Sequence, residues 1–331
     1  MAWAPSVRHA LASGDLARPG RCNPPMARFT HFEPPRQRLL LANGAIDVEL
    51  WPEVAGAVAG MRYLAAGTPV DVLRPTARLP AYSPRDLACW ALLPYSNRLR
   101  DGRLEHAGKR YRLPINHEGF LHAQHGVAWI RPWQVERAGA DAVRLVLAHA
   151  PDENWPFAFE ARLDYRLLDD GLEIVTSLRS LADVAVPAGL GQHPYLHRPP
   201  GSRLQAGVGS VWRCDHGTLP VAREALPPEW NLPAGCDLDG VAIDNCFDDF
   251  AGEARLLLAD GASVQVQADP SCRHVLVYNP IDQPFVCIEP VTHMPDAANL
   301  ALVDASVRPM PLVAPGGTLQ VRHCIRYHPA S

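Results

Sequence analysis

Polar side chains that could do chemistry gather at five places in a chain that is 47% apolar. They are Asn97-Arg98; His117, His122 and His125; His193-Pro194-Tyr195 with His197; Asp244; and Glu289 with the Pro295-Asp296 step downstream. Imidazole and carboxylate groups are the groups that proteins use most often to bind metals and to move protons. Metal binding and acid–base catalysis are therefore the two chemistries to compare.

Metal binding is the weaker explanation of the histidine spacing. His193 and His197 are four positions apart, which would place both imidazoles on one face of a helix. Pro194 stands between them and disfavours a regular helix. On a strand the two residues share a face but lie about 13 Å apart, too far for one ion. We therefore expect no metal site, although His117, His122 and His125 are also close in sequence.

Several other chemistries lack their usual sequence signature. The chain has no G-x-S-x-G elbow, no G-x-x-x-x-G-K phosphate loop and no G-x-G-x-x-G stretch. Its eight cysteines are scattered without a C-x-x-C pair. That pattern argues against a zinc ribbon or a redox motif, and is typical of free thiols in a reducing cytoplasm.

Acid–base catalysis is the better explanation of Glu289 and His193. We expect Glu289 to end an apolar strand over 285–288 and to be fixed by Pro290, where partial desolvation raises a carboxyl pKa. The alternative is an edge-strand glutamate that faces water. Pro194 restricts the backbone of His193 to extended values and so fixes its imidazole. The same sequence would also suit a hydrogen-bonded histidine in the core. A fixed carboxylate and a fixed imidazole can move protons on two sides of a substrate.

The remaining polar candidates each have a functional and a structural explanation. The guanidinium of Arg98 can bind a carboxylate or sugar hydroxyls, or form a surface salt bridge. His125 could be a loop histidine in a turn, and Asp244 a hairpin or capping residue. Tyr195 is expected to pack beside His193. Taken singly, none of these signals decides the function.

Strands are the elements that must position these residues. Apolar and polar residues alternate from Phe157 to Leu167, and again from Leu172 to Leu178 after the turn Asp169-Asp170-Gly171. A second hairpin runs from 255–258 through Asp260-Gly261 to 264–266. Further strands are expected at 39–41, 46–50, 143–148, 274–278, 286–288 and 319–327, with short helical turns near 83–90 and 224–231.

The composition favours an all-β chain. It has 33 prolines and no long helical period, so we predict one large antiparallel β-sandwich domain over residues 31–331, with a ligand cleft on a concave face. Residues 1–30 are expected to be a disordered extension, with Met26 as a second candidate start. A net charge of −4 disfavours nucleic-acid binding, and no apolar run is long enough to cross a membrane. We predict a cytoplasmic protein.

Five motifs, taken in order, resemble the aldose 1-epimerase family, the galactose mutarotases, over residues 38–328. The motifs in this chain are NRLRDGRLEHAGKRYRLPIN (97–116), His125-Gly126, GQHPYL (191–196), DNCF (244–247) and EPVTHMPDAAN (289–299). Two segments of this chain depart from the pattern that is typical of galactose mutarotases: Leu196-His197 follows the His-Pro-Tyr step, and Asn245 follows the aspartate. The resemblance is therefore to a divergent branch.

This resemblance implies a β-supersandwich with a monosaccharide in a cleft. By analogy, Glu289 is the base that takes the proton from the anomeric hydroxyl O1, and His193 is the acid that protonates the ring oxygen. The sugar would be held by Arg98, His125 and Asp244, together with Asn97 and Tyr195. The analogy requires no metal and no organic cofactor.

Two other functions remain open from the sequence. A sugar-binding or sensing protein could keep the cleft without turnover, but binding alone does not need Glu289 and His193. A glycoside hydrolase or lyase would need a second catalytic carboxylate, for which Asp244 is the obvious candidate. Oligomeric state is not predicted by any of these features.

Overall fold

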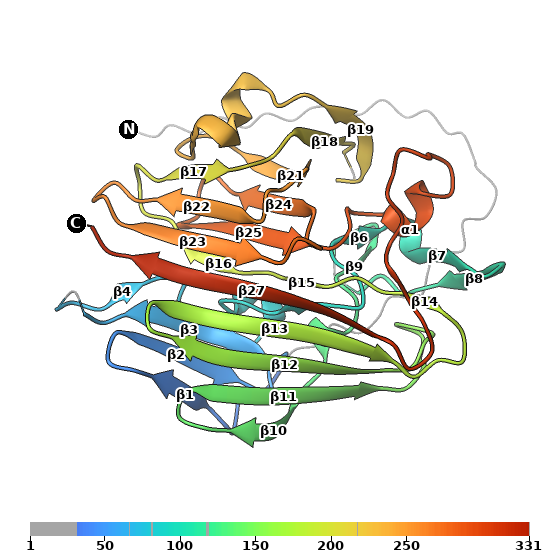
Figure 1. The fold of residues 1–331 in the computed structure, drawn as a ribbon, viewed down its shortest axis with the longest axis horizontal. Helices are drawn as coiled ribbons and strands as arrows, with labels where there is room; N and C mark the ends of the chain where they lie inside the picture. Colours follow the sequence, from blue (N-terminus) through green and yellow to red (C-terminus); the bar gives the residue numbers. More distant parts are fainter. Residues whose placement is uncertain (1–31, 66, 81, 117–118, 217, 331) are drawn as a thin grey trace, which may run out of the picture.

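The chain folds into two stacked layers of β-sheet in the computed structural model, which describes residues 32–65, 67–80, 82–116, 119–216 and 218–330 (Figure 1). The predicted extension over residues 1–30 lies outside the described residues, as does His117. The predicted all-β class with large antiparallel sheets is confirmed. The division of the chain into an extension and one domain stays a prediction.

One layer is a nine-stranded sheet. Its strands, in spatial order, are β10 (Gln134–Ala138), β11 (Ala142–His149), β12 (Phe159–Leu168), β13 (Gly171–Ser180), β27 (Thr318–His328), β23 (Ser263–Ala268), β22 (Glu253–Leu257), β17 (Arg203–Ala206) and β20 (Cys236–Asp237). In Figure 1 the long strands β11, β12, β13 and β27 cross the molecule side by side.

The other layer combines an eight-stranded and a four-stranded sheet. The larger contains β19 (Pro220–Glu224), β18 (Ser210–Cys214), β21 (Ile243–Asp248), β24 (His274–Asn279), β25 (Phe285–Val291), β15 (Gly191–Gln192), β5 (Ala91–Leu92) and β16 (Tyr195–His197), which pairs with β25. The smaller contains β1 (Leu39–Ala42), β2 (Ile46–Trp51), β3 (Ala57–Tyr63) and β4 (Val70–Asp71). Isolated bridges from Val58 to Cys89 and from Leu73 to Leu196 join the two sheets.

Side-chain hydrogen bonds connect the two layers. The hydroxyl of Tyr165 on β12 donates to the carbonyl of Gly56 at 2.6 Å, and Nε2 of His323 on β27 lies 3.0 Å from the carbonyl oxygen of Pro290 on β25. One continuous cluster of buried apolar residues fills the space between the layers. The seven described cysteines are all free, and no described helix has the length and apolarity to cross a membrane.

The hairpin β12–β13 follows the predicted alternation. Phe159, Ala161 and Leu163 are buried, whereas Glu160 and Arg162 on the opposite face are partly or fully exposed. Leu168 pairs with Gly171 across the turn. A period of two therefore predicted both the strands and the face that each residue occupies.

Short elements complete the fold and were harder to predict. The expected helical turns are present as 3-10 helices η1 (Pro84–Asp86) and η4 (Pro228–Trp230), whereas helix α1 (Ala297–Leu300) and strand β21 were not predicted. The remaining elements are η2 (Arg100–Gly102), η3 (Ala128–Ile130), η5 (Leu232–Ala234) and the strand pairs β6 (Arg98–Leu99) with β9 (Ala123–Gln124), β7 (Arg103–His106) with β8 (Lys109–Arg112), and β14 (Val186–Pro187) with β26 (Leu312–Val313).

Strand β25 corrects one prediction. The strand does not end before Glu289 but continues through Pro290 to Val291. On one side β25 is paired with β24 from Cys287 to Val291; on the other, its pairing to β16 ends at Cys287 and its pairing to β15 starts at Val291. Glu289 and Pro290 occupy this break, where a residue without an N–H is tolerated inside a sheet.

Candidate functional site

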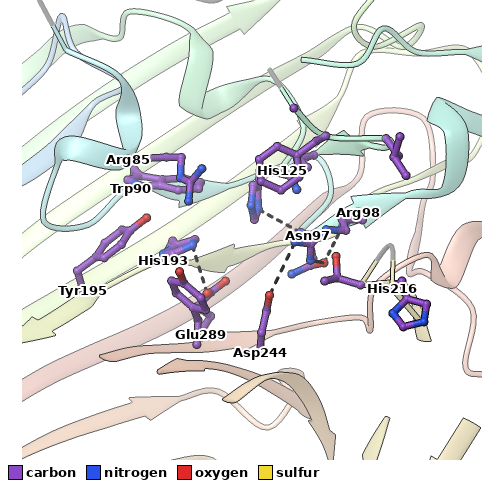
Figure 2. A pocket seen from close by; sticks show the side chains of 16 residues that line it. Arg85, Trp90, Asn97, Arg98, His125, His193, Tyr195, His216, Asp244 and Glu289 are labelled. Atoms are coloured by element: carbon purple, nitrogen blue, oxygen red, sulfur yellow. Dashed lines mark hydrogen bonds and ion pairs between the residues drawn. The ribbon is translucent and has the colours of Figure 1, made fainter. Parts of the chain in front are cut away.

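A pocket of about 350 Å³ brings the predicted site residues together (Figure 2). Its lining includes all seven of them: Asn97, Arg98, His125, His193, Tyr195, Asp244 and Glu289. The volume lies at the lower end of the range for small-molecule sites, which is about 300–1,000 Å³. Residues far apart in the sequence thus share one cavity of the size that a small ligand requires.

His193 and Glu289 face each other where the sheet is interrupted. His193 and Pro194 separate β15 from β16, and they lie opposite the stretch of β25 with Glu289, which is paired with β24 but not with β15 or β16. Nε2 of His193 lies 3.2 Å from Oε1 of Glu289, and the other carboxyl oxygen, Oε2, is buried without a hydrogen-bond partner among the described residues. Glu289 is only 2% exposed, so the alternative of a glutamate facing water is wrong.

Burial favours the neutral form of both groups. It raises the pKa of Glu289 well above its usual range; the negative charge of Asp244 raises it further, and Arg98 opposes the shift. Burial also lowers the pKa of His193 to about 3, with smaller contributions from the positive charges of Arg85 and Arg74. Burial thus favours a protonated Glu289 carboxyl beside a neutral His193 imidazole, and two groups this close titrate as a coupled pair.

Aromatic rings fix the orientation of the His193 imidazole. Trp90 stacks on one face at a centroid distance of 4.4 Å and Tyr195 on the other at 4.7 Å. The ring of His125 approaches edge-on at 5.6 Å. The predicted packing of Tyr195 beside His193 is thus present, and the imidazole has little freedom to rotate.

Strands β6 and β9 position Asn97, Arg98 and His125. Arg98 pairs with Gln124, so Asn97 and His125 are the next residues along the same ladder. Both adopt left-handed backbone angles, with φ of 53° and 57°. The Asn97 N–H donates to Nδ1 of His125 at 3.2 Å, so the neutral imidazole carries its proton on Nε2.

Arg98 and Asp244 supply complementary hydrogen-bonding groups. Asp244 lies on β21, and its Oδ2 is 4.0 Å from Nη2 of Arg98. Arg98 Nη1 donates to Oδ1 of Asn97 at 3.1 Å, while Arg98 Nε is buried and has no hydrogen-bond partner in the part of the chain that the structure describes. The Arg98 side chain is 10% exposed, so it is not a surface salt bridge. Such donors and acceptors match the hydroxyls of a sugar, which both donate and accept.

Comparison with known proteins identifies the family. The family model described as aldose 1-epimerase matches residues 62–323. The chain belongs to the aldose 1-epimerase family. The Escherichia coli K12 protein YphB, described as uncharacterized, is 27% identical over 220 residues, which cover 64% of this chain and 75% of YphB. Galactose mutarotase of Rattus norvegicus is 31% identical over 159 residues, or 45% of this chain and 42% of that protein.

A solved structure confirms the family fold. The galactose mutarotase-like protein of Clostridium acetobutylicum superposes with a TM-score of 0.79 at 22% identity, covering 87% of this chain and 94% of that one. The resemblance found in the sequence motifs and the β-sandwich architecture that it implied are therefore both confirmed.

Potential metal-binding groups in this family member differ from those suggested by histidine spacing. Among the described residues, two buried sets of three donors have ligand atoms within 4.8 Å of one another: His193, Cys287 and Glu289, and Cys246, Asp248 and His274. A metal would need the cysteines as thiolates. Burial raises the pKa of both thiols well above its ordinary value, which works against that form.

Several pocket residues were not predicted from the sequence. They are Arg85, Trp90, Phe120, Gln124, His216, Thr218 and Tyr278. Trp90 lies in an apolar run, ACWALL, in which an aromatic residue predicts a position in the hydrophobic core. Arg85 belongs to the expected helical turn near 83–90, but nothing in that turn indicated that its side chain reaches the site. Conversely, His122 was a candidate, yet its Nδ1 accepts the Asp101 N–H at 3.1 Å outside the pocket lining.

Proposed function

We propose that this family member is an aldose 1-epimerase that interconverts the α and β anomers of a hexose by acid–base ring opening and closure. The observation that carries the proposal is the His193–Glu289 pair at 3.2 Å, buried beside a cavity lined with hydroxyl-binding groups. Binding alone does not require such a pair. The relative from Rattus norvegicus is named galactose mutarotase, which is a name for this kind of activity.

The proposed reaction begins with a proton on Nε2 of His193 and an ionised Glu289. Glu289 takes the proton from the O1 hydroxyl, and the C1–O1 bond becomes the aldehyde carbonyl. The bond between C1 and the ring oxygen breaks, and His193 gives its proton to that oxygen. Rotation about C1–C2 presents the other face of the carbonyl, and the reverse steps close the ring as the other anomer. Each group regains its starting state, so no cofactor is consumed.

The electrostatics of the pocket support this proton balance. When the ring is open, Glu289 is protonated and His193 is neutral, which is the form that burial favours in both residues. The short distance between Nε2 and Oε1 also lets a proton move between the two groups. Desolvation of the ion pair thus favours the ring-opening step.

The remaining lining residues are proposed to hold the sugar. Arg98 and Asp244 offer a cation and an anion at 4.0 Å from each other, which suits vicinal hydroxyls. His125 presents its Nε2 proton as a donor, because Nδ1 already accepts from Asn97. Tyr195 supports the imidazole rather than the sugar, since one of its ring faces is covered by His193.

Anomer exchange followed by NMR tests the proposal. Fresh α-glucose, α-galactose and other aldoses would equilibrate with wild type, His193→Asn or the control His197→Asn, which replaces a half-buried histidine outside the pocket. We expect acceleration that is lost in His193→Asn and kept in His197→Asn. Saturable sugar binding without acceleration would instead indicate a carbohydrate-binding or sensing protein. Equal acceleration by all three proteins would refute the role of His193.

We extend the proposal to two broader properties of the chain. Residues 31–331 form a single catalytic domain, supported by the continuous buried cluster that runs through both layers. The protein acts in the cytoplasm, supported by its seven free described cysteines, which are typical of a reducing compartment.

A further inference from the structure

Arg74 lies behind the proton-transfer pair, outside the lining of the sugar pocket. Its guanidinium carbon is 3.9 Å from the centroid of the Tyr195 ring and 4.7 Å from that of Phe285. Its Nη2 donates to the carbonyl oxygens of Arg85 at 2.5 Å and of Leu87 at 2.8 Å. The side chain is therefore held by aromatic faces and backbone carbonyls.

This contact completes a stack that contains the His193 imidazole. The order is Trp90, His193, Tyr195 and Arg74, with the ring pairs inclined by only 26° and 19°. Tyr195 has His193 on one face and the guanidinium on the other. Because a cation over an aromatic face attracts it, Arg74 holds the tyrosine ring in the plane that fixes the imidazole.

Backbone hydrogen bonds tie Arg74 to the same region. The Arg74 N–H donates to the carbonyl of Tyr195 at 2.8 Å, while the N–H groups of Tyr195 and His193 donate to the carbonyls of Ala88 and Trp90, each at 2.9 Å. The Arg74 side chain in turn fixes the carbonyls of Arg85 and Leu87 at the end of η1. One residue thus links the segment that carries His193 to the turn that presents Arg85.

Resting on the proposed function, we propose that Arg74 is a positioning residue for the proton donor His193, acting through Tyr195 and η1 without touching the sugar. Two consequences follow from its removal. The Tyr195 ring loses the group that covers its outer face, and the imidazole then samples orientations that do not reach the ring oxygen. A misplacement of about 1 Å can cost on the order of 100-fold in rate.

Removal also takes away a positive charge that lowers the pKa of His193. The titratable and charged groups around His193 are Glu289, Cys287, Cys89, Tyr195, His125, Arg85 and Arg74. Because burial favours a protonated Glu289 beside a neutral His193, the further proton that the pair binds at low pH goes to His193, and the acid limb of the rate–pH profile follows the pKa of His193. Substituting Arg74 alone leaves the other groups in place, so a shift of that limb reports the loss of this one charge.

The test compares Arg74→Met, Arg74→Lys and the control Arg38→Met, whose guanidinium lies over Trp51 at 5.2 Å in another part of the fold. We expect Arg74→Met to lower kcat about 10-fold or more with KM changed less than about twofold, and to move the acid limb to higher pH. Arg74→Lys should keep the acid limb but recover only part of kcat, since an ammonium cannot stack as a guanidinium does. Arg38→Met should match wild type.

Two results would overturn the inference. One is wild-type kcat and pH profile in Arg74→Met. The other is a rise in KM at constant kcat, which would place Arg74 in sugar binding. Should wild type accelerate no sugar, the proposed function fails, and the ring ¹⁵N shifts of His193 still test the positioning role. An unchanged His193 titration in Arg74→Met, or in the equally uncharged Arg74→Gln if the Met variant does not fold, would then refute it.

Discussion

Replacing Glu289 by Gln separates activity from stability. The two side chains are nearly isosteric, and the site around Glu289 is closed, with 2% of the residue exposed. The amide cannot accept the O1 proton, so we expect anomer exchange to fall by about 10²–10⁴-fold, the usual contribution of a general base. In activation free energy this is about 3–5.5 kcal/mol.

The same substitution should stabilise the protein relative to wild type, and this gain should grow as pH rises. Burial holds the pKa of Glu289 well above its unfolded value of 4.5. A group whose pKa is raised by folding binds more protons in the folded state, so the free energy of unfolding declines above pH 4.5 by up to about 1.4 kcal/mol per pH unit, until the folded pKa is reached. Gln does not ionise and lacks this term. The variant should therefore gain stability relative to wild type between pH 5 and 8.

Two assays decide the point. NMR exchange gives the rate, and urea unfolding at pH 5 and pH 8 gives the stability difference, with Glu160→Gln on β12 as a partly exposed control. We expect the Glu289 variant to show the reduced exchange rate given above and to be relatively more stable at pH 8. Retained exchange would refute its role as base. A stability difference that is the same at both pH values would refute the claim that the buried carboxyl keeps its proton.

Three further substitutions test other parts of the site and its scaffold. Asp244→Asn removes the charge facing Arg98 and should raise KM on the order of 10-fold, from initial exchange rates against sugar concentration; an unchanged KM would exclude Asp244 from binding. Burial lowers the pKa of His323 to about 4, so as pH falls the unfolded state binds a proton at this residue before the folded state does. The protein should therefore lose about 2 kcal/mol of stability between pH 7 and pH 5, and urea titrations of His323→Gln should show a smaller loss. Gly126 has φ of 69°, and an added Cβ would lie 2.2 Å from the Leu93 carbonyl oxygen, so Gly126→Ala should destabilise the fold by more than about 2 kcal/mol; an unchanged melting temperature would contradict this.

Local patterns predicted the parts of the fold that have a local cause. The alternation over 157–178 identified β12 and β13 because one face of that hairpin is buried along its whole length. Strand β21 was missed because three of its six residues, IDNCFD, are polar or acidic, and one of these, Asp248, is buried in contacts with other strands. Asp248, for instance, accepts from Trp212 Nε1 at 2.8 Å, a pairing that no short window contains.

In the candidate site, too, only the residues with a local sequence signal were predicted. His193 and Glu289 stood out because a proline follows each of them and a family motif surrounds each. Arg74 carried no such signal, since its role comes from a tyrosine 121 positions away in sequence, and only the folded chain places the two together at 3.9 Å. Residues that act through another side chain are the ones that sequence patterns identify least well.

The interruption of the sheet beside β25 has a consequence for how the reaction centre is encoded. Pro194 and Pro290 each lack an N–H, so the two segments cannot close into a continuous ladder at that point. The opening is written into the covalent chain and does not depend on a mobile loop. A His-Pro dipeptide and a Glu-Pro dipeptide on neighbouring strands therefore form a compact signature, one that can be sought in other β-sandwich sequences to locate a proton-transfer pair.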